Sequence, residues 1–277
     1  MGVDEKYNSL VESLRSLGRV VVAFSGGVDS TFLLRVAADV LGPGNVLACI
    51  GTSASLSRSQ HEQALALAAR MGVRVREVAV DEMADPAYSA NLADRCFHCK
   101  SHLFALLRDI ARQEGIEHIL CGSNSDDRDD YRPGNRAAQV FGVKAPLMEA
   151  QLTKAEIREL SRRLGLETAD IPASPCLASR IRYGLEITDE RLRQVEQAED
   201  FLRSLGLVEF RVRHHGDLAR IEVRPDDMPL LLRQDSREAI VGRLKSLGFK
   251  FVSLDLQGFR SGAMNETLTE GEKESYR

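Results

Sequence analysis

Val20-Val21-Val22-Ala23-Phe24-Ser25-Gly26-Gly27-Val28-Asp29-Ser30 is the stretch that decides the fold of this chain. Its apolar start predicts a buried strand, its two glycines a tight turn, and the residues after them the first turn of a helix. Glycines let a backbone approach an anion, Ser25 and Ser30 carry hydroxyl donors, and the N–H groups that begin a helix point at the same place. The loop therefore predicts a phosphate site, although the chain has no G-x-x-x-x-G-K-[ST] and no G-x-G-x-x-G after a strand. A glycine-rich turn that binds nothing is the alternative.

Two loops carry the expected nucleotide contacts. Asp29 is a candidate ligand for Mg²⁺, or a carboxylate that orients the loop by accepting hydrogen bonds from backbone N–H groups. The alternative is a carboxylate with neither role, which the helix dipole stabilises at the helix N-terminus. The polar segment 122–127 follows another predicted strand and is expected to contact the adenylyl group or to form a second metal site, unless it is only a polar turn. The residues assigned to nucleotide binding are Ser25, Gly26, Gly27, Val28, Asp29, Ser30, Gly122, Asn124 and Asp127.

Strands and helices alternate through the first half of the chain. After a helix at about 4–17, predicted strands at 20–24, 46–50, 73–80 and 118–121 alternate with predicted helices at 31–41, 57–71 and 101–113. This order predicts an α/β fold with a parallel sheet and right-handed crossovers. Ligands on such sheets bind at the carboxyl ends of the strands, so both loops are expected to open onto one edge.

The second half of the chain has a different pattern. Thr153-Lys154-Ala155-Glu156 fits a capping box that starts a helix to about 164, and two prolines then bracket a constrained loop. After residue 188 the pattern indicates a helix, two short strands, one or two helices and a last strand. This order predicts a small α+β domain of ferredoxin-like type. We expect a first domain at 1–172, a linker carrying Cys176 at 173–187, an α+β domain at 188–262 and a polar tail at 263–277.

The composition of this 277-residue chain limits the classes of function. A net charge of −4 and a pI of about 5.9 disfavour general nucleic-acid binding, although a local basic patch would permit it. The apolar runs are too short to span a bilayer and no charged-then-apolar leader is present, which indicates a cytoplasmic protein with no membrane partner. Five cysteines, an odd number, argue against a disulfide framework and for thiol or metal chemistry.

Cys96-Phe97-His98-Cys99-Lys100 is a C-x-x-C placed just before the predicted helix at 101–113. A helix N-terminus and the neighbouring Lys100 would lower the pKa of a thiol. Zinc needs four ligands, and no second C-x-x-C or H-x₃-H completes such a set. The pattern leaves open a redox pair, an iron–sulfur site with a third thiolate from elsewhere, and two idle cysteines.

Two further groups of residues stand out after the prolines. Cys176 follows Pro175 on a constrained loop near Arg180, where a reactive thiolate is plausible, although a lone cysteine is more often structural. Arg211 and Arg213 lie two apart on a strand and so face the same way, which suits bidentate binding of a phosphate or carboxylate. A solvated strand face is the alternative for the arginines. The other two cysteines are predicted to be core residues. Cys49 lies in an apolar predicted strand, and Cys121 ends another.

Six segments that occur in one order together resemble a known family. They are 25–30, 122–127, 130–134 (D-Y-R-P-G), 144–147 (K-A-P-L), 174–181 (S-P-C-L-A-S-R-I) and 211–216 (R-V-R-H-H-G). The S-G-G-x-D-S loop resembles the PP-loop of the ATP pyrophosphatases, and the whole set resembles the LarE family of ATP-dependent sulfur transferases of nickel-pincer cofactor synthesis. The similarity extends to about residue 260. It implies a Rossmann-like sheet of the PP-loop type and a homo-oligomer.

The resemblance also implies a reaction. ATP adenylates a carboxylate of pyridinium biscarboxylate mononucleotide, and pyrophosphate leaves. A cysteine at the position of Cys176 attacks the acyl adenylate, and cleavage of its C–S bond leaves sulfur on the substrate and dehydroalanine on the protein. By the same resemblance, Arg211 and Arg213 bind the phosphate of the substrate. The residues given a catalytic role are Cys176, Asp29, Ser179, Arg180, Glu199 and Glu222.

A branch of this family has three cysteines that correspond to Cys96, Cys99 and Cys176, and it is thought to bind a 4Fe–4S cluster through them. Three thiolates leave one iron open, where exchangeable sulfide can sit, and thiolates tied to iron are poor nucleophiles. The resemblance therefore favours a cluster as sulfur carrier over the sacrifice of Cys176. ATP, Mg²⁺ and a 4Fe–4S cluster are the expected cofactors.

Three other functions would share the phosphate loop. A transfer-RNA thiolation enzyme also uses cysteines, but it would need a basic face or an added RNA-binding module. A glutamine-dependent amidotransferase subunit would not explain the C-x-x-C, and a nucleotide-sensing module would bind ATP without chemistry. The sequence therefore favours a sulfur transferase that acts on a small nucleotide.

Overall fold

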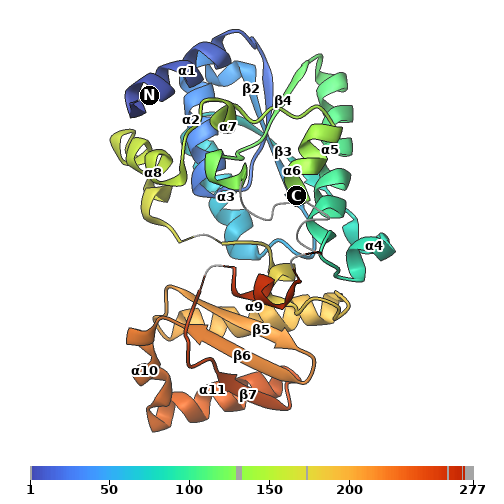
Figure 1. Ribbon diagram of the computed structural model, residues 1–277, viewed down its shortest axis with the longest axis vertical. Coiled ribbons are helices and arrows are strands. Elements are labelled where there is room, and N and C mark those ends of the chain that lie inside the picture. The colour runs from blue at the N-terminus through green and yellow to red at the C-terminus, as the bar shows by residue number, and fades with distance from the viewer. Residues whose placement is uncertain (1, 129–132, 173, 261, 270, 272–277) are drawn as a thin grey trace. The chain divides into compact units, whose positions relative to one another are not determined.

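The computed structural model describes residues 2–128, 133–172, 174–260, 262–269 and 271 (Figure 1). They divide into two compact units, the first made of residues 2–82 and 94–174 and the second of residues 83–93 and 175–271. The motif residues 130–132 and the end of the predicted tail, 272–277, lie outside the described residues. Within the described ranges no helix combines the length and the apolar character that crossing a membrane requires.

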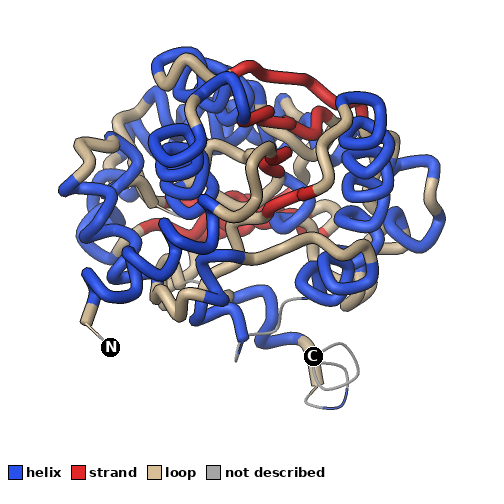
Figure 2. The backbone as a smooth tube through the Cα atoms, turned by 90° about the horizontal axis from the view of Figure 1, so that it is seen from above, coloured by secondary structure: helices blue, strands red, loops and turns tan. Residues whose placement is uncertain are grey.

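A four-stranded sheet with the strand order β3-β2-β1-β4 forms the centre of the first unit. Its strands are β1 (Val20–Ala23), β2 (Val46–Thr52), β3 (Arg74–Ala79) and β4 (His118–Leu120). Every neighbouring pair is parallel. The predicted α/β fold with a parallel sheet is therefore confirmed, and Figure 2 shows the strands in red among helices in blue.

Helices cover both faces of this sheet because its strand residues alternate between two cores. Val20 and Val22 pack in one core, and Val21 between them packs in the other. The first core includes residues of α1 (Val3–Arg15), α2 (Val28–Leu41), α3 (Arg58–Arg70) and α8 (Lys154–Arg163). The second includes residues of α5 (Arg95–Glu114) and α6 (Pro133–Val140). Burial on both faces accounts for the continuous apolar run of β1.

Short elements connect the helices and strands of both units. They are α4 (Pro86–Ser89), α7 (Pro146–Glu149) and the 3₁₀ turns η1 (Pro43–Asn45), η2 (Glu82–Ala84), η3 (Ser125–Arg128), η4 (Glu167–Asp170), η5 (Leu177–Arg180), η6 (Pro225–Asp227) and η7 (Ala263–Thr267).

Helix α5 begins at Arg95, earlier than predicted, so the C-x-x-C lies within the helix and not before it. The added turns pack against α6, where Gly134 permits a close approach: a Cβ at this position would lie 3.1 Å from Lys100 Cγ. The Arg136 guanidinium also stacks over the ring of Phe97. These contacts join segments that are distant in the sequence, and the local pattern before residue 101 carries no sign of them.

In the second unit, the elements follow in the predicted α-β-β-α-β order. They are α9 (Asp189–Ser204), β5 (Phe210–His215), β6 (Leu218–Val223), α10 (Met228–Leu232), α11 (Gln234–Ser246) and β7 (Phe251–Leu254). β5 and β6 are antiparallel, whereas β6 and β7 are neighbours and parallel. A ferredoxin-like sheet has a split βαβ, with another strand between the parallel pair, so that expectation is wrong. The order of elements does not determine which strands become neighbours.

The segments predicted as the linker at 173–187 and the polar tail at 263–277 both have described residues that pack within the second unit. The Asn91 side-chain amide donates to the carbonyl oxygens of Ile181, Arg182 and Leu185, which anchors part of the predicted linker. In the predicted tail, apolar residues in and just after η7 are buried: Ala263, Met264 and Leu268. Three apolar residues among polar ones are too sparse to give a periodic signal, which is why the sequence indicated a tail.

His214 lies on the core face of β5, with its ring centroid 4.9 Å from that of Phe249. Its Nδ1 accepts a hydrogen bond from the Gly216 N–H (3.2 Å), so the neutral ring carries its proton on Nε2, which lies 2.8 Å from Gln194 Oε1. Burial lowers the pKa of His214 to about 4, and burial also lowers the pKa of His215 to about 4. Both imidazoles are therefore neutral in the folded protein at neutral pH.

We expect the stability of the protein to fall as the pH is lowered from about 6.5 towards 4. The unfolded imidazoles take up a proton near pH 6.5, whereas the folded ones resist until about pH 4, so protonation favours the unfolded state in this window and has no effect above it. One pKa unit corresponds to about 1.4 kcal/mol, so protonation of His214 alone would cost at most about 3 kcal/mol at pH 4. Thermal unfolding midpoints measured against pH test this. His214→Gln should flatten the curve, and an equally steep fall in the variant would contradict the assignment.

Candidate active site

The Ser30 hydroxyl organises the loop after β1. Ser30 Oγ donates to the Gly27 carbonyl (3.1 Å), accepts from the Ser25 N–H (3.3 Å) and lies 3.1 Å from Ser25 Oγ. Gly27 is the N-cap of α2, and both Gly27 and Ser25 are exposed. The loop therefore presents its backbone and the start of a helix to solvent, which is the arrangement that binds a phosphate.

Two glycines permit close approaches around this loop. Gly26 has a φ of +71°, and a Cβ on it would lie 3.0 Å from Ala64 Cβ. Gly122 lies two residues after the end of β4, and a Cβ on it would lie 2.9 Å from the Ser30 nitrogen. β4 neighbours β1 where the strand order reverses, which is where ligands of open parallel sheets bind. The two predicted nucleotide loops thus meet at one edge of the sheet.

The side chains of Asn124 and Asp127 shape the turn that follows Gly122. Asn124 Oδ1 accepts a hydrogen bond from the Asp126 N–H (2.9 Å), and Asp127 Oδ2 accepts one from the Asn124 N–H (3.0 Å). These bonds hold the loop in the form that brings Gly122 against Ser30. Direct contact of either side chain with a nucleotide stays a prediction.

Asp29 is the second residue of α2 and lies beside the phosphate loop. Its Oδ2 forms an ion pair with Lys154 Nζ. Its Oδ1 is buried and has no hydrogen-bond partner among the described residues. A carboxylate oxygen that the described residues leave unpaired fits Mg²⁺ at this place, because that ion binds one or two carboxylates together with the phosphates of a substrate.

Cys176, in the second unit, immediately precedes η5 and is held through its backbone. Its carbonyl oxygen accepts hydrogen bonds from Ser179 Oγ (2.7 Å) and Arg180 Nη1 (3.0 Å). Arg180 Nη1 also donates to the Pro175 carbonyl. Ser179 and Arg180 therefore fix the loop that carries the thiol.

Glu199 joins this cysteine loop to strand β5. Its Oε1 accepts from Arg180 Nε (3.0 Å) and from the Val212 N–H (3.2 Å), and its Oε2 accepts from Arg180 Nη2 (3.1 Å). The Arg180 and Glu199 side chains are only 3 % and 6 % exposed. A fork-shaped pair of this kind fixes orientation as well as charge. The geometry favours positioning roles for these two residues over contact with a substrate.

Arg211 and Arg213 lie on one face of β5, as the alternation predicts, opposite Glu222 and Arg220 of β6. Arg213 Nη2 lies 2.7 Å from Glu222 Oε2, and Arg220 Nη2 lies 3.0 Å from Glu222 Oε1. Arg220 also pairs with Asp255 (2.9 Å). Arg211 and Arg213 are only 8 % and 6 % exposed, so the alternative of a solvated strand face is wrong.

Positive charge exceeds negative charge in this network, whose charged members are Arg180, Arg211, Arg213, Arg220, Glu199, Glu222 and Asp255. Burial, and after it the charge of the nearby Arg180, lower the pKa of Arg211 to about 10. The Arg211 guanidinium lies over the Phe259 ring, 5.0 Å from its centroid. The guanidiniums of Arg180 and Arg211 repel each other, and a phosphate or carboxylate beside Arg211 would reduce this repulsion. The arrangement therefore fits the predicted binding of the substrate phosphate.

Cys96 and Cys99 lie three residues apart in the first turns of α5, and so on one side of the helix. Both are partly exposed. Two thiols at this spacing fit two ligands of one cluster, whereas Cys176 belongs to the other unit. In the part of the chain that the structure describes, no group of three or more His, Cys, Asp or Glu residues is arranged to hold a metal ion. The three-cysteine cluster therefore stays a prediction.

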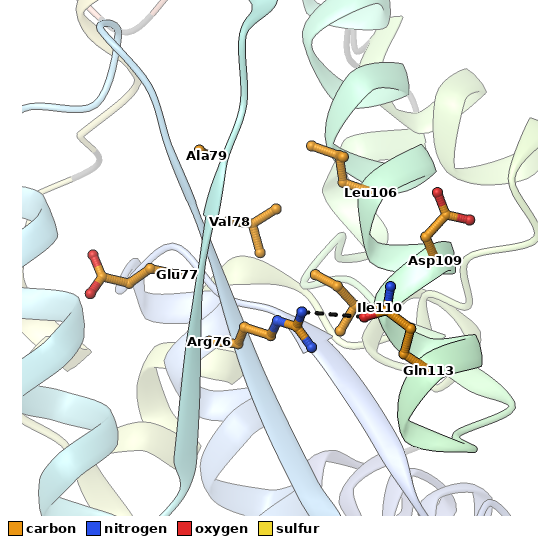
Figure 3. Close-up of a pocket in the computed structure, with 8 residues that line it drawn as sticks. All are labelled: Arg76, Glu77, Val78, Ala79, Leu106, Asp109, Ile110 and Gln113. Atoms are coloured by element: carbon orange, nitrogen blue, oxygen red, sulfur yellow. Dashed lines mark hydrogen bonds between the residues drawn. The ribbon is translucent and has the colours of Figure 1, made fainter.

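A groove of about 360 Å³ lies between β3 and α5 (Figure 3). Arg76 Nη2 donates to Gln113 Oε1 (3.3 Å) across it. Its lining residues are Arg76, Glu77, Val78, Ala79, Leu106, Asp109, Ile110 and Gln113. None of them is a predicted site residue, so the groove is separate from both loops described above.

Some residues beside the predicted ones had no assigned role. In the sequence Lys154 is only part of a helix-capping signal, and its place directly after the N-cap Thr153 gives no hint of its partner Asp29. Arg220 lies on β6 and Asp255 directly follows β7, and both join the buried network through ion pairs. The alternation of side chains around Arg220 is the sequence signal that could have indicated its place there.

The parallel sheet and the glycine loop at its switch point define the chain as a protein of the ATP pyrophosphatase class, and the NAD synthase family matches residues 5–108. Over 271 residues the chain is 39 % identical to the pyridinium-3,5-bisthiocarboxylic acid mononucleotide synthase of Lactiplantibacillus plantarum, covering 98 % of each chain. It is 42 % identical over 267 residues to an uncharacterized protein of Synechocystis, covering 96 % of this chain and 99 % of the relative. A tRNA-specific 2-thiouridylase of Parvibaculum lavamentivorans is 27 % identical over 307 residues, covering 92 % of this chain and 76 % of the relative.

The chain belongs to the family of the pyridinium-3,5-bisthiocarboxylic acid mononucleotide synthases, the LarE family, as its motifs predicted. It is an enzyme that uses ATP, a sulfurtransferase. The transfer-RNA thiolation enzymes are more distant relatives.

Proposed function

We propose that this enzyme uses ATP to activate the carboxylates of pyridinium biscarboxylate mononucleotide and replaces an oxygen of each with sulfur, in nickel-pincer cofactor synthesis. The similarity to the Lactiplantibacillus synthase over nearly the whole chain supports this substrate. We also propose that it acts in the cytoplasm as a homo-oligomer.

The observation that carries the proposal is the position of Glu199. One buried carboxylate accepts hydrogen bonds from Arg180, which holds the Cys176 loop, and from the Val212 N–H between the two buried arginines of β5. The candidate sulfur site and the candidate phosphate site of the second unit are thereby fixed relative to each other. A cysteine held at a set distance from an anion site suits sulfur transfer to a phosphorylated substrate.

The residues divide the proposed reaction between them. The loop 25–30 holds the phosphates of ATP, and the loop 122–127 contacts the adenylyl group. Asp29 would hold Mg²⁺ through its Oδ1 and lower the charge on the phosphates. Arg211 and Arg213 hold the phosphate of the substrate. A substrate carboxylate attacks the α-phosphorus of ATP and pyrophosphate leaves. Sulfur then displaces AMP from the acyl adenylate.

The source of the sulfur distinguishes two versions of the proposal. A 4Fe–4S cluster held by Cys96, Cys99 and Cys176 would supply exchangeable sulfide at its open iron. In the other version the Cys176 thiolate attacks the acyl adenylate and AMP leaves. Loss of the Cys176 α-proton then breaks the Cβ–S bond, which leaves a thiocarboxylate on the substrate and dehydroalanine on the protein. We favour the first version because the chain has the C-x-x-C in addition to Cys176.

Cys176→Ala is expected to abolish sulfur transfer and to retain pyrophosphate release, since the adenylation residues are untouched. Cys96→Ala separates the two versions: it abolishes transfer if a cluster is the carrier and leaves it intact if Cys176 is the donor. The measurements are pyrophosphate release and product mass with pyridinium biscarboxylate mononucleotide, using anaerobically prepared protein whose iron and sulfide are assayed.

Cys49→Ala is the matched control, because Cys49 is fully buried and burial raises the pKa of its thiol to about 12. Absence of pyrophosphate release with this substrate in the unmodified enzyme would contradict the proposal. Salt-sensitive binding of transfer RNA in place of the mononucleotide would favour the thiolation alternative.

A further inference from the structure

Lys154 lies where three segments of the first unit meet. It is the first residue of α8, and its backbone N–H donates to Asp126 Oδ2 (2.9 Å). Its ammonium group forms an ion pair with Asp29 Oδ2. The two carboxylates come from the loop after β4 and from the start of α2. Both predicted nucleotide loops therefore contact one lysine residue.

The backbone of Lys154 is fixed, while its side chain can move. Thr153 and Glu156 form a complete capping box around it, and Lys6 Nζ lies 2.8 Å from Glu156 Oε1. The Lys154 side chain, by contrast, is 32 % exposed. A lysine ammonium is a point charge on a flexible four-carbon stem with three rotatable donors. It can therefore change partners without a shift of α8.

Asp29 is only half satisfied in this arrangement. The ammonium of Lys154 occupies Oδ2, whereas the buried Oδ1 has no hydrogen-bond partner among the described residues. Such an exception in a folded protein needs a reason, and a role in binding a metal ion is one. A divalent cation at Oδ1 would lie close to the ammonium and be repelled by it. The ion pair and a metal ion thus compete for one carboxylate.

We propose that Lys154 is a positioning residue that neutralises Asp29 in the nucleotide-free enzyme and yields this carboxylate to the metal ion of bound ATP. The inference rests on the proposed use of ATP with Mg²⁺. Once displaced, the ammonium is available to the triphosphate, which is the nearest new anion. The lysine therefore sets the metal concentration at which the enzyme accepts a nucleotide.

The test is calorimetric binding of a non-hydrolysable ATP analogue to the full-length protein over a series of Mg²⁺ concentrations. Lys154→Met removes the charge and keeps the length of the side chain, so the half-saturating Mg²⁺ concentration should fall about tenfold, within the usual range of coupling between two sites. Lys154→Arg keeps the charge and should retain the wild-type requirement. Lys154→Gln replaces the methionine variant if that variant fails to fold.

Lys6→Met is the matched control, since it breaks another lysine ion pair to α8 without touching Asp29. In an Asp29→Asn background the effect of Lys154→Met should vanish. An unchanged or higher Mg²⁺ requirement in Lys154→Met, with wild-type binding intact, overturns this inference and leaves the proposed function standing. Binding of the analogue to the wild type without any need for metal also overturns it. Absence of nucleotide binding in the wild type would overturn both.

Discussion

Glu222→Ala is expected to destabilise the second unit by about 3–5 kcal/mol, the usual cost of removing one partner of a buried ion pair. Glu222 is fully buried, and its two carboxylate oxygens pair separately with Arg213 and Arg220. Without it, two neighbouring guanidiniums face each other with reduced compensation. The melting temperature should fall by roughly 10 °C. Thermal unfolding followed by circular dichroism measures this.

Asp217→Ala is the matched control for this change. Asp217 pairs with Lys250 in the same unit at 2.9 Å, but both side chains are mostly exposed. Exposed pairs contribute about 0–1 kcal/mol, so this variant should melt close to the wild type. Equal losses in the two variants would show that burial does not matter here. A stable Glu222→Ala protein with normal substrate affinity would also count against a network that orients Arg213.

Local sequence patterns predict much of this fold because each depends on neighbouring residues alone. The alternating cores of β1 follow from a continuous apolar run, and the start of α8 follows from the cap at Thr153 and Glu156. The early start of α5 does not follow, because it depends on Gly134 lying against Lys100. The pairing of β6 with β7 likewise depends on where α10 and α11 return the chain. Such contacts are properties of the assembled unit.

The candidate site, too, is partly predictable from local sequence and partly dependent on contacts between distant segments. Alternation along β5 places Arg211 and Arg213 on one face, but the same alternation describes a solvated strand. Only Glu222 from another strand, and Glu199 from α9, show that the arginines are buried in a charged network. Lys154 is the clearest omission, since its sequence neighbourhood indicates a helix start and nothing indicates Asp29, more than a hundred residues away.

Gly122→Ala is expected to weaken ATP binding at least tenfold and to cost about 1–3 kcal/mol of stability, the usual range for overpacking. The added methyl group would lie 2.9 Å from the Ser30 nitrogen and 3.1 Å from the Ser30 Cα. Both are backbone atoms at the start of α2, so no side chain can swing away to make room. The loop 25–30 would have to shift from the position in which its N–H groups converge. Binding of an ATP analogue, measured by calorimetry, reports the effect.

Gly44→Ala provides the control, because a Cβ on Gly44 meets nothing within 4 Å in the same unit. Its ATP affinity should match that of the wild type. If Gly122→Ala binds ATP normally while losing stability, the contact between the two loops is structural and the phosphate site does not depend on it. If both stability and binding are unchanged, the close approach of Gly122 to Ser30 is itself wrong. Loss of binding in Gly122→Ala alone ties the ATP site to the meeting point of the loops after β1 and β4.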